Sequence, residues 1–462
     1  MQKYWLDLIY LVASVMFIMG IKGLGHPRTA VHGNFISGMG MLIAIVVTIM
    51  DRQILFPAFI GSGLLVGTII GLVMAVRVEL TQMPQLVALF NGFGGAASVL
   101  VAGAFIGQQV YLAQPITTQV LIATLASGVI GAVTFFGSLI AFAKLQELMS
   151  GNPVKFPGQE FANGIFFVVI LGAGTWSLSG SVNPIPVFWI LTILSCGFGI
   201  SIVMPVGGAD MPVVIALLNS LSGIAAIAVG FVISNSVLII SGSLVGASGL
   251  ILTRIMCKAM NRSLTNVMLG LIDVGEVTAG NEIYEGRIKS ATADEVALLF
   301  DDARRVVVVP GYGLAVAQAQ TAMRDLTVLL ESRNVLVEFA IHPVAGRMPG
   351  HMNVLLADAN ISYDKLREMD DINPSMEKAD IVLVVGANDV VNPVARTDPK
   401  SPIAGMPIID ADKARSIVVI KRSLSPGYAG IPNPLFCLDN TLMLFGDANR
   451  ALLDLVAAIK EL

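Results

Sequence analysis

Arg-Arg-Val-Val-Val-Val-Pro-Gly-Tyr-Gly-Leu-Ala-Val-Ala-Gln-Ala-Gln, residues 304–320, is the stretch that decides the fold of this 462-residue chain. An apolar run ends in a turn with Gly311 and Gly313, and this order predicts a strand, a tight turn and a helix. Glycine at such a turn lets the backbone approach a pyrophosphate, whose charge the helix N-terminus favours. Val316 stands where the usual dinucleotide fingerprint has a third small residue, so an ordinary tight turn is the alternative.

The residues around this turn predict an α/β domain. Strands are expected at 304–309, 335–341, 380–386, 416–421 and 441–445, and helices at 313–332, 350–359 and 447–461. Strands that alternate with helices imply a parallel sheet whose two faces are covered. We therefore expect a soluble, Rossmann-like domain.

The chain before residue 260 has the composition of a membrane protein. Hydrophobic residues make up 55% of the whole chain and charged residues 13%, with a mean hydropathy of +0.79, whereas soluble domains carry about 25% charge. Because a span needs about 20 apolar residues, nine transmembrane helices are expected, near 4–22, 33–50, 54–76, 83–105, 117–143, 161–179, 185–205, 211–232 and 235–257. The expected domains are a membrane bundle over 1–260, a linker over 261–290 and the α/β domain over 291–462.

Lysine and arginine near the span ends predict the orientation. Two of them, Lys3 and Arg52, fall on one side of the membrane, and eight fall on the other: Lys22, Arg28, Arg77, Lys144, Lys155, Arg254, Lys258 and Arg262. Because cations gather in cytoplasmic loops, the C-terminal domain is expected in the cytoplasm. The net charge of −4 gives no sign of nucleic-acid binding, and the three cysteines match no metal spacing, so no metal site is expected.

Two predicted spans resemble each other. Residues 83–97 align without gaps on residues 211–225, with seven of fifteen positions identical, including Asn91 and Asn219. Parallel repeats in transporters place functional groups at their mutual interface. We therefore expect the two asparagines to face each other across a wet cavity, with Asp210 at its cytoplasmic mouth. The alternatives are that the asparagines only join helices and that Asp210 only caps one.

Charged residues after the predicted strands indicate which dinucleotide binds. The acid expected on a ribose about 20 residues after the glycines does not follow the strand at 335–341, where Arg347 comes instead. Lys421-Arg422-Ser423 follows a later strand. Cations suit a 2′-phosphate, which favours NADP over NAD. An ordinary solvated strand end is the alternative for both groups.

A third group of candidates follows the strand at 380–386. Gly386 and Ala387 allow close approach to a cofactor, and Asn388 and Asp389 come directly after them. Because ligands bind at the carboxyl ends of strands in open α/β sheets, Asp389 is expected near the nicotinamide or the partner interface. Its alternative role is to cap the next turn.

Long stretches of the chain resemble the beta subunit of proton-translocating NAD(P) transhydrogenase. They are residues 311–320, 341–354, 386–389, 421–423 and 427–430 in the α/β part, and 209–220 and 256–263 in the membrane part. The resemblance covers essentially the whole chain.

The resemblance implies that this chain binds NADP(H) and that an alpha subunit holds NAD(H), in a dimer of alpha–beta units in a bacterial inner membrane. It also implies that the cofactor lies reversed relative to ordinary Rossmann domains. The residues implied to line NADP, beside Gly311, Gly313 and Gly386, are Tyr312, Val344, Ala345, Gly346, Arg347, Met348, Pro349, Asn388, Asp389, Lys421, Arg422, Ser423, Gly427, Tyr428, Asp447 and Ala448.

The implied proton path contains Asn91, Asp210 and Asn219, and here the chain departs from the family. Members commonly have a protonatable histidine where this chain has Asn91, and an amide does not ionise at physiological pH. The proton carrier must then be Asp210, Glu79, His32 or a group of the partner, which we favour. A nucleotide-gated channel is the alternative function, although the spans lack a filter such as Thr-Val-Gly-Tyr-Gly.

Overall fold

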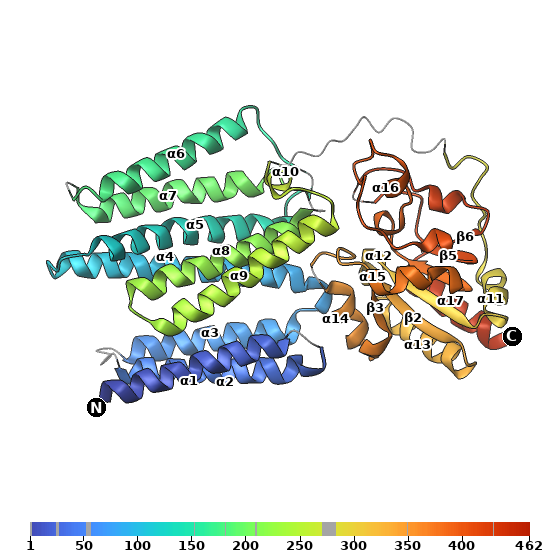
Figure 1. The fold of residues 1–462 in the computed structure, drawn as a ribbon, viewed down its shortest axis with the longest axis horizontal. Helices are drawn as coiled ribbons and strands as arrows, with labels where there is room; N and C mark the ends of the chain where they lie inside the picture. Colours follow the sequence, from blue (N-terminus) through green and yellow to red (C-terminus); the bar gives the residue numbers. More distant parts are fainter. Residues whose placement is uncertain are drawn as a thin grey trace. The chain divides into compact units, whose positions relative to one another are not determined.

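The structure is a computed structural model that describes residues 2–24, 27–51, 57–151, 153–180, 182–207, 210–269, 283–348, 350–427 and 429–462. The chain forms two compact units, one of residues 1–206 and 214–253 and the other of residues 207–213 and 254–462. Figure 1 shows the first unit as a helical bundle and the second as an α/β fold. The predicted fold class is confirmed.

Long apolar helices build the first unit. Among the described residues they are α1 (Gln2–Leu24), α2 (Pro27–Asp51), α3 (Pro57–Arg77), α4 (Met83–Tyr111), α5 (Thr118–Leu145), α6 (Gln159–Ser177), α7 (Pro184–Val203), α8 (Met211–Val232) and α9 (Ser236–Ala259). Eight of them contain a segment long and apolar enough to cross a membrane, and in α1 the apolar stretch is Leu8–Leu24. Each predicted span therefore coincides with a helix.

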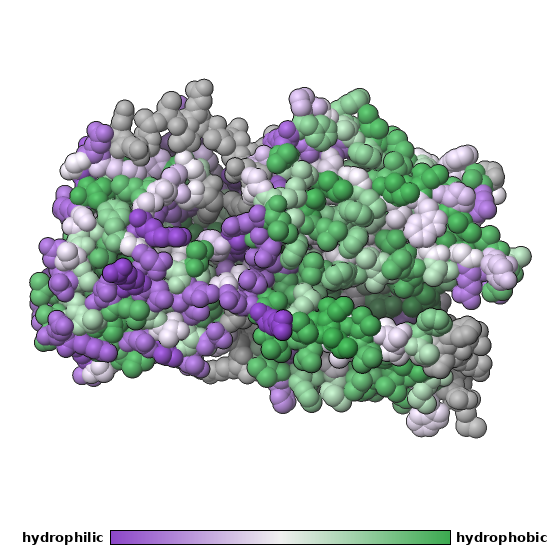
Figure 2. Space-filling model, turned by 180° about the vertical axis from the view of Figure 1, so that it is seen from behind, coloured by the Kyte–Doolittle hydropathy of each residue, from purple (hydrophilic) through white to green (hydrophobic). Residues whose placement is uncertain are grey.

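Glycine brings these helices together. A Cβ on Gly95 of α4 would lie 2.5 Å from the carbonyl oxygen of Gly131 in α5, and a Cβ on Gly223 of α8 would lie 2.4 Å from the nitrogen of Gly246 in α9. Backbones in such contact are typical of helices that associate in lipid, where small residues allow close packing. Figure 2 shows hydrophobic side chains over the helical unit and hydrophilic ones gathered over the α/β unit, as a lipid-facing surface requires.

The α/β unit contains a six-stranded parallel sheet. Its strands are β1 (Arg305–Pro310), β2 (Leu336–Ile341), β3 (Leu366–Glu368), β4 (Ile381–Val385), β5 (Ser416–Lys421) and β6 (Thr441–Phe445), in the order β3-β2-β1-β4-β5-β6. The middle strands read as continuous apolar runs because both faces of the sheet are covered. The five predicted strands are all present.

The remaining helices of this unit are shorter than those of the bundle. They are α10 (Leu264–Met268), α11 (Ala293–Asp301), α12 (Tyr312–Val316), α13 (Gln320–Ser332), α14 (His351–Asp358), α15 (Met369–Ile372), α16 (Val394–Thr397) and α17 (Ala448–Glu461). Short 3-10 helices are η1 (Leu80–Gln82) in the helical unit and η3 (Tyr363–Lys365), η4 (Asn373–Lys378), η5 (Asp389–Val391), η6 (Ala411–Lys413) and η7 (Pro434–Cys437) in the α/β unit.

The structure corrects the helix predicted over 313–332, which is two helices. Gln318 has φ +49°, and Ala319 N donates to Leu314 O at 3.1 Å. A residue in the left-handed region ends a helix because it turns the chain out of the helical path. Helix α11 was not predicted, although Thr292 and Glu295 form a capping box at its start.

Candidate functional site

The order of the strands reverses between β1 and β4, and ligands of open α/β sheets bind beside such a point. Gly311 follows β1, and Gly386 follows β4. Gly311 N donates to Val385 O at 2.9 Å, and Gly313 N donates to Gly386 O at 2.9 Å. A Cβ on Gly311 would lie 2.4 Å from Gly386 O. The glycine turn read from the sequence lies at the reversal, where two backbones touch and leave no room for a side chain.

These two hydrogen bonds limit how the glycines can contribute to nucleotide binding. The N–H groups of Gly311 and Gly313 donate to carbonyls of the protein, so they are not directed at a phosphate. Helix α12 after the turn has only five residues. The glycines therefore form a closed backbone contact, called here the glycine floor, and side chains around it supply the polar groups.

Arg347 lies beside this floor, in the loop after β2. Its guanidinium carbon is 4.5 Å from the centroid of the Tyr312 ring, a cation–π distance. Arg347 N donates to His351 Nδ1 at 3.1 Å. Gly346 has φ +127°, and a Cβ there would meet the His351 ring at 2.6 Å. The loop thus needs glycine beside His351 to present Arg347.

His351 holds the loop as a neutral ring. Burial, aided by the charge of Arg347, lowers the pKa of His351 to about 4. Because Nδ1 accepts a hydrogen bond, Nε2 carries the proton. Nε2 has no hydrogen-bond partner among the described residues, so it is a buried donor beside Arg347 and Tyr312.

His342 stands directly after β2, where a ribose-binding acid would otherwise be expected. Its Nε2 lies 2.8 Å from Pro407 O, and its Nδ1 accepts a bond from Val344 N at 3.2 Å. Burial lowers the pKa of His342 to about 4, so the ring is neutral and Nε2 donates to Pro407. His342 therefore joins the loop after β2 to the segment before η6.

Lys421 is the last residue of β5, a strand that lies on the other side of the β1–β4 reversal from β2. Its Nζ donates to Ser425 O at 2.9 Å and lies 5.0 Å from the centroid of the Phe436 ring. With the Asn388 amide turned to satisfy its neighbours, Asn388 Oδ1 accepts from Lys421 Nζ at 3.0 Å and from Gly427 N at 2.7 Å. Burial lowers the pKa of Lys421 to about 8, while the charge of Asp389 opposes this shift.

Asp389 is buried beneath the loop that follows Lys421. Its Oδ2 accepts a bond from Ala429 N at 3.0 Å, and a Cβ on Gly427 would come within 2.3 Å of the same oxygen. Asp389 is the first residue of η5, whose N-cap residue is Asn388 and which has no side-chain cap bond. The carboxylate therefore joins η5 to the loop that carries Ala429.

The other implied residues lie along the same carboxyl edge of the sheet. Asp447 follows β6 and caps α17, where its side chain accepts from Asn449 N and Arg450 N. Pro349 and Tyr428 lie outside the described residues. Of the remaining ones, Val344, Ala345 and Ala448 are buried, Met348 is half-buried, and Arg422 and Ser423 are exposed.

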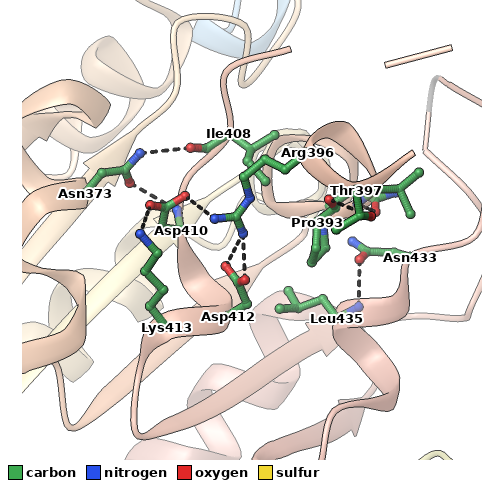
Figure 3. A network of polar contacts seen from close by, with 12 residues as sticks. Asn373, Pro393, Arg396, Thr397, Ile408, Asp410, Asp412, Lys413, Asn433 and Leu435 are labelled. Atoms are coloured by element: carbon green, nitrogen blue, oxygen red, sulfur yellow. Dashed lines mark hydrogen bonds and ion pairs between the residues drawn. The ribbon is translucent and has the colours of Figure 1, made fainter. Parts of the chain in front are cut away.

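An ion network that the sequence did not predict joins α16 to η6 (Figure 3). Arg396 of α16 pairs with Asp410 at 3.0 Å and with Asp412 at 2.6 Å, and Lys413 pairs with Asp410 at 2.8 Å. Asp410 N also donates to Asn373 Oδ1 at 3.1 Å. The network fixes the segment that carries Pro407, the partner of His342. Pairs 14 and 16 residues apart follow no helix or strand period, so no pattern could have indicated them.

In the helical unit, Asn91 of α4 contacts α8, the helix whose sequence resembles that of α4. Asn91 Nδ2 lies 3.5 Å from Ile215 O, a long hydrogen bond from α4 to α8. Ile215 precedes Asn219 by four residues, which is one helical turn. Asn91 is buried, and Asn219 is partly exposed. A cavity shared by the two asparagines stays a prediction.

Asp210 precedes α8 and is nearly fully buried. Its Oδ2 accepts a bond from Arg262 NH1 at 2.9 Å, with 1% of the Asp210 side chain exposed. A buried carboxylate requires such a partner because removing the cation would leave an uncompensated charge. The ion pair joins the start of α8 to the segment after α9.

The model of the family described as NAD(P) transhydrogenase beta subunit matches residues 6–458 of the chain. Two sequences named NAD(P) transhydrogenase subunit beta, both from Rhodospirillum rubrum, are each 46% identical to it over 456 residues. These matches cover 97% of this chain and 98% of each relative.

Helices apolar enough to span a membrane, a parallel sheet with Arg347 and Lys421 at its carboxyl edge and a family match over nearly the whole length agree with one another. The chain belongs to the NAD(P) transhydrogenase beta-subunit family and is a membrane-spanning subunit of a transhydrogenase that acts on nicotinamide nucleotides.

Proposed function

We propose that this chain binds NADP(H) in the crevice beside β1 and β4 and that the alpha subunit holds NAD(H). The observation that carries this proposal is the charge around the crevice. Arg347 comes from the β2 side and Lys421 from the β5 side, and neutral His342 follows β2 in place of an acid. Cations without a ribose-binding acid favour a nucleotide with a 2′-phosphate.

The residues around the crevice fit such a nucleotide. The glycine floor admits a flat group close to the backbone, and Arg347, Lys421 and Arg422 can form charge-assisted bonds with phosphate. His351 Nε2 and the Asn388 amide offer neutral polar groups. When bound, NADP supplies the ring that exchanges hydride with NADH. The residues of this chain bind and orient it, so no acid or nucleophile is required from them.

Asp389 is proposed to act beside the nicotinamide or at the contact with the alpha subunit. Its support is its place at the carboxyl end of β4, buried against the loop that carries Gly427 and Ala429. Asp389→Asn keeps the shape of the side chain and removes its charge. We expect slower hydride transfer or weaker NADP binding, and a variant that keeps both would contradict the proposal.

We further propose that hydride transfer is coupled to proton movement through the helical unit. Asn91, Asp210 and Asn219 would line the path, and the alpha subunit would supply the ionising group. Protonation would favour one NADP(H)-binding state over another, which is coupling by differential affinity. The location proposed is a bacterial inner membrane, with the α/β domain of residues 291–462 in the cytoplasm and the enzyme a dimer of alpha–beta units. A nucleotide-gated channel has no support from the family.

The test is binding of NADP+ and NAD+ to the alpha–beta complex in which one cation is neutralised. Arg347→Gln, Lys421→Gln and Arg422→Gln are compared with Lys460→Gln in the last turn of α17. Losing a charged hydrogen bond costs about 1.5–3 kcal/mol. At least one of the three variants should therefore bind NADP+ about 10- to 100-fold more weakly and NAD+ as before. Equal losses for both nucleotides would assign the cations to the pyrophosphate or to structure.

A further inference from the structure

Residues 283–292, called here the anchor segment, comprise the end of the predicted linker and the residues that precede α11. Met443 N of β6 donates to Lys289 O at 2.8 Å. Near the start of the segment, Cys437 Sγ donates to Ile283 O at 3.5 Å. The anchor segment is therefore bonded to the α/β unit at both of its ends.

Tyr284 is the buried residue of the anchor segment, with 7% of its surface exposed. Its hydroxyl oxygen accepts a bond from Asn433 N at 2.7 Å. Its ring stacks on Phe436 with centroids 6.4 Å apart and planes 25° apart. Burial raises the pKa of Tyr284, so the phenol stays protonated at physiological pH.

One route leads from Tyr284 to Lys421 through an aromatic ring. Phe436 is fully buried and contacts both residues, with the Tyr284 ring stacked on it and the Lys421 ammonium 5.0 Å from its centroid. The attraction of an ammonium to a ring depends on its place over the ring face. The plane of Phe436, which Tyr284 supports, therefore fixes where Lys421 Nζ lies.

A second route leads from Tyr284 to Asn388 through Asn433. Asn433 is fully buried, its N–H donates to Tyr284, and its Nδ2 donates to Asn388 O at 3.0 Å. Asn388 in turn accepts a bond from Lys421 Nζ. Both routes end on the same pair of residues at the carboxyl edge of the sheet.

We propose that Tyr284 is a positioning residue for the NADP(H) site, and that it places Lys421 and Asn388. This inference rests on the proposed function. Because Tyr284 lies in the anchor segment, the affinity for NADP(H) depends on the chain that leads from the membrane helices into the α/β unit. A tyrosine with a merely structural role would lower stability without changing the preference for NADP over NAD.

The experiment measures the ratio of NADP+ to NAD+ affinity in the complete alpha–beta complex. Tyr284→Leu removes both routes, and Tyr284→Phe keeps the ring but not the acceptor for Asn433. Tyr363 of η3 is the matched control, because it is half-buried and precedes β3 at the amino edge of the sheet. Lys421→Gln reports whether Lys421 itself sets the ratio.

We expect the ratio to fall about tenfold in Tyr284→Leu, less in Tyr284→Phe, and not at all in Tyr363→Leu. A changed ratio in Lys421→Gln beside an unchanged one in Tyr284→Leu would overturn the positioning role alone. An unchanged ratio in Lys421→Gln would remove the proposed role of this cation, and the inference with it. If Tyr284→Leu does not assemble, Tyr284→Phe decides: an unchanged ratio there overturns the route through Asn433.

Discussion

The two units of this chain use polar side chains in different ways. In the helical unit many hydroxyls return to their own helix, as Ser98 does to Gly94 O at 2.9 Å and Thr134 to Ile130 O at 2.7 Å. In the α/β unit, polar side chains join distant segments, as Asn433 does to Asn388, 45 residues away. A lipid-facing helix satisfies its own backbone, so a side-chain bond between two helices, such as Ser127 to Ser98 O or Ser220 to Gly246 O, marks a specified contact.

Two further bonds of this kind also link helices through carbonyl groups. Asn91 reaches Ile215 O from α4 to α8. Buried Lys144 of α5 donates to Met204 O at 2.6 Å and Val206 O at 2.8 Å, at the C-terminal end of α7, where a cation is favoured by the helix dipole. Lys144 is thus not a solvated loop residue. Of the eight lysines and arginines that predict a cytoplasmic C-terminal domain, the other seven still support that orientation.

The largest expected effect tests the proposed proton path in the helical unit. Asn219→Leu removes an amide from the proposed path, so proton translocation should be abolished and the coupled reaction slowed, while NADP still binds to the α/β unit. Asn163→Leu in α6 is the control and should translocate protons normally. Both are measured in vesicles as reduction of thio-NADP by NADH, with and without a proton gradient. Undiminished translocation in Asn219→Leu would leave Asn219 as a residue that only joins helices.

The next effect tests the loop contacts of the α/β unit. Gly386 has φ +65°, and a Cβ would lie 2.4 Å from the Cα of Gly313. Gly386→Ala combines about 1–2 kcal/mol for the left-handed backbone with about 1–3 kcal/mol for overpacking. Gly286→Ala has φ +70° but an open surrounding, so it should cost only the first amount. Urea unfolding measures both, and equal losses would show that the two loops can separate cheaply.

A smaller effect concerns the boundary of the α/β unit. A fragment that begins at Ile283 and one that begins at Gly286 should both be soluble and bind NADP(H). The free energy of unfolding of the longer fragment should be higher by roughly 2 kcal/mol. Truncating a buried aromatic residue within a chain costs about 3–5 kcal/mol. The difference between the fragments is smaller because the shorter fragment also has fewer residues to order on folding. Thermal unfolding compares them. Neither fragment should catalyse transhydrogenation alone, and activity in either would refute the argument that a second nucleotide site is required.

The smallest effect is a dependence on pH. The folded-state pKa of Lys421 is lowered to about 8, so the amine loses its proton above that pH, whereas phosphate favours the ammonium. The affinity for NADP+ should therefore fall by up to about tenfold per pH unit above 8, with proton uptake on binding. Lys421→Arg stays charged and should flatten this slope. Calorimetry in two buffers checks it, and the same slope in both proteins would place the titration on another group.

Strong local patterns made most of the fold predictable. The apolar run at Val306–Val309 and the long spans are decided by burial, which the sequence encodes directly. Strand β3 is only Leu366–Glu368, an edge strand with two charged residues, so no period could reveal it. The break at Gln318 was missed because a residue other than glycine adopts the left-handed region there.

The sequence predicted which residues follow the strands and so belong to the candidate site. It did not predict which of those residues contact one another. Gly311, Gly386 and Lys421 each follow a strand, and strand ends meet at one edge of a parallel sheet. Tyr284 was missed because it stands in a polar stretch, where an adjacent pair of apolar residues, Ile283 and Tyr284, was the only sign of a buried anchor. Its contacts with residues about 150 positions away depend on tertiary folding alone.

The bonds of Gly311 and Gly313 to the loop after β4 also bear on product release. The turn after β1 and the loop after β4 cannot separate without breaking two main-chain hydrogen bonds, so this side of the proposed site is fixed. On the other side of β4, the Asp389 carboxylate accepts a bond from Ala429 N and so helps to hold the loop after β5. Release of a nucleotide past that loop would require the loop to open, and loop opening sets the rate in many enzymes.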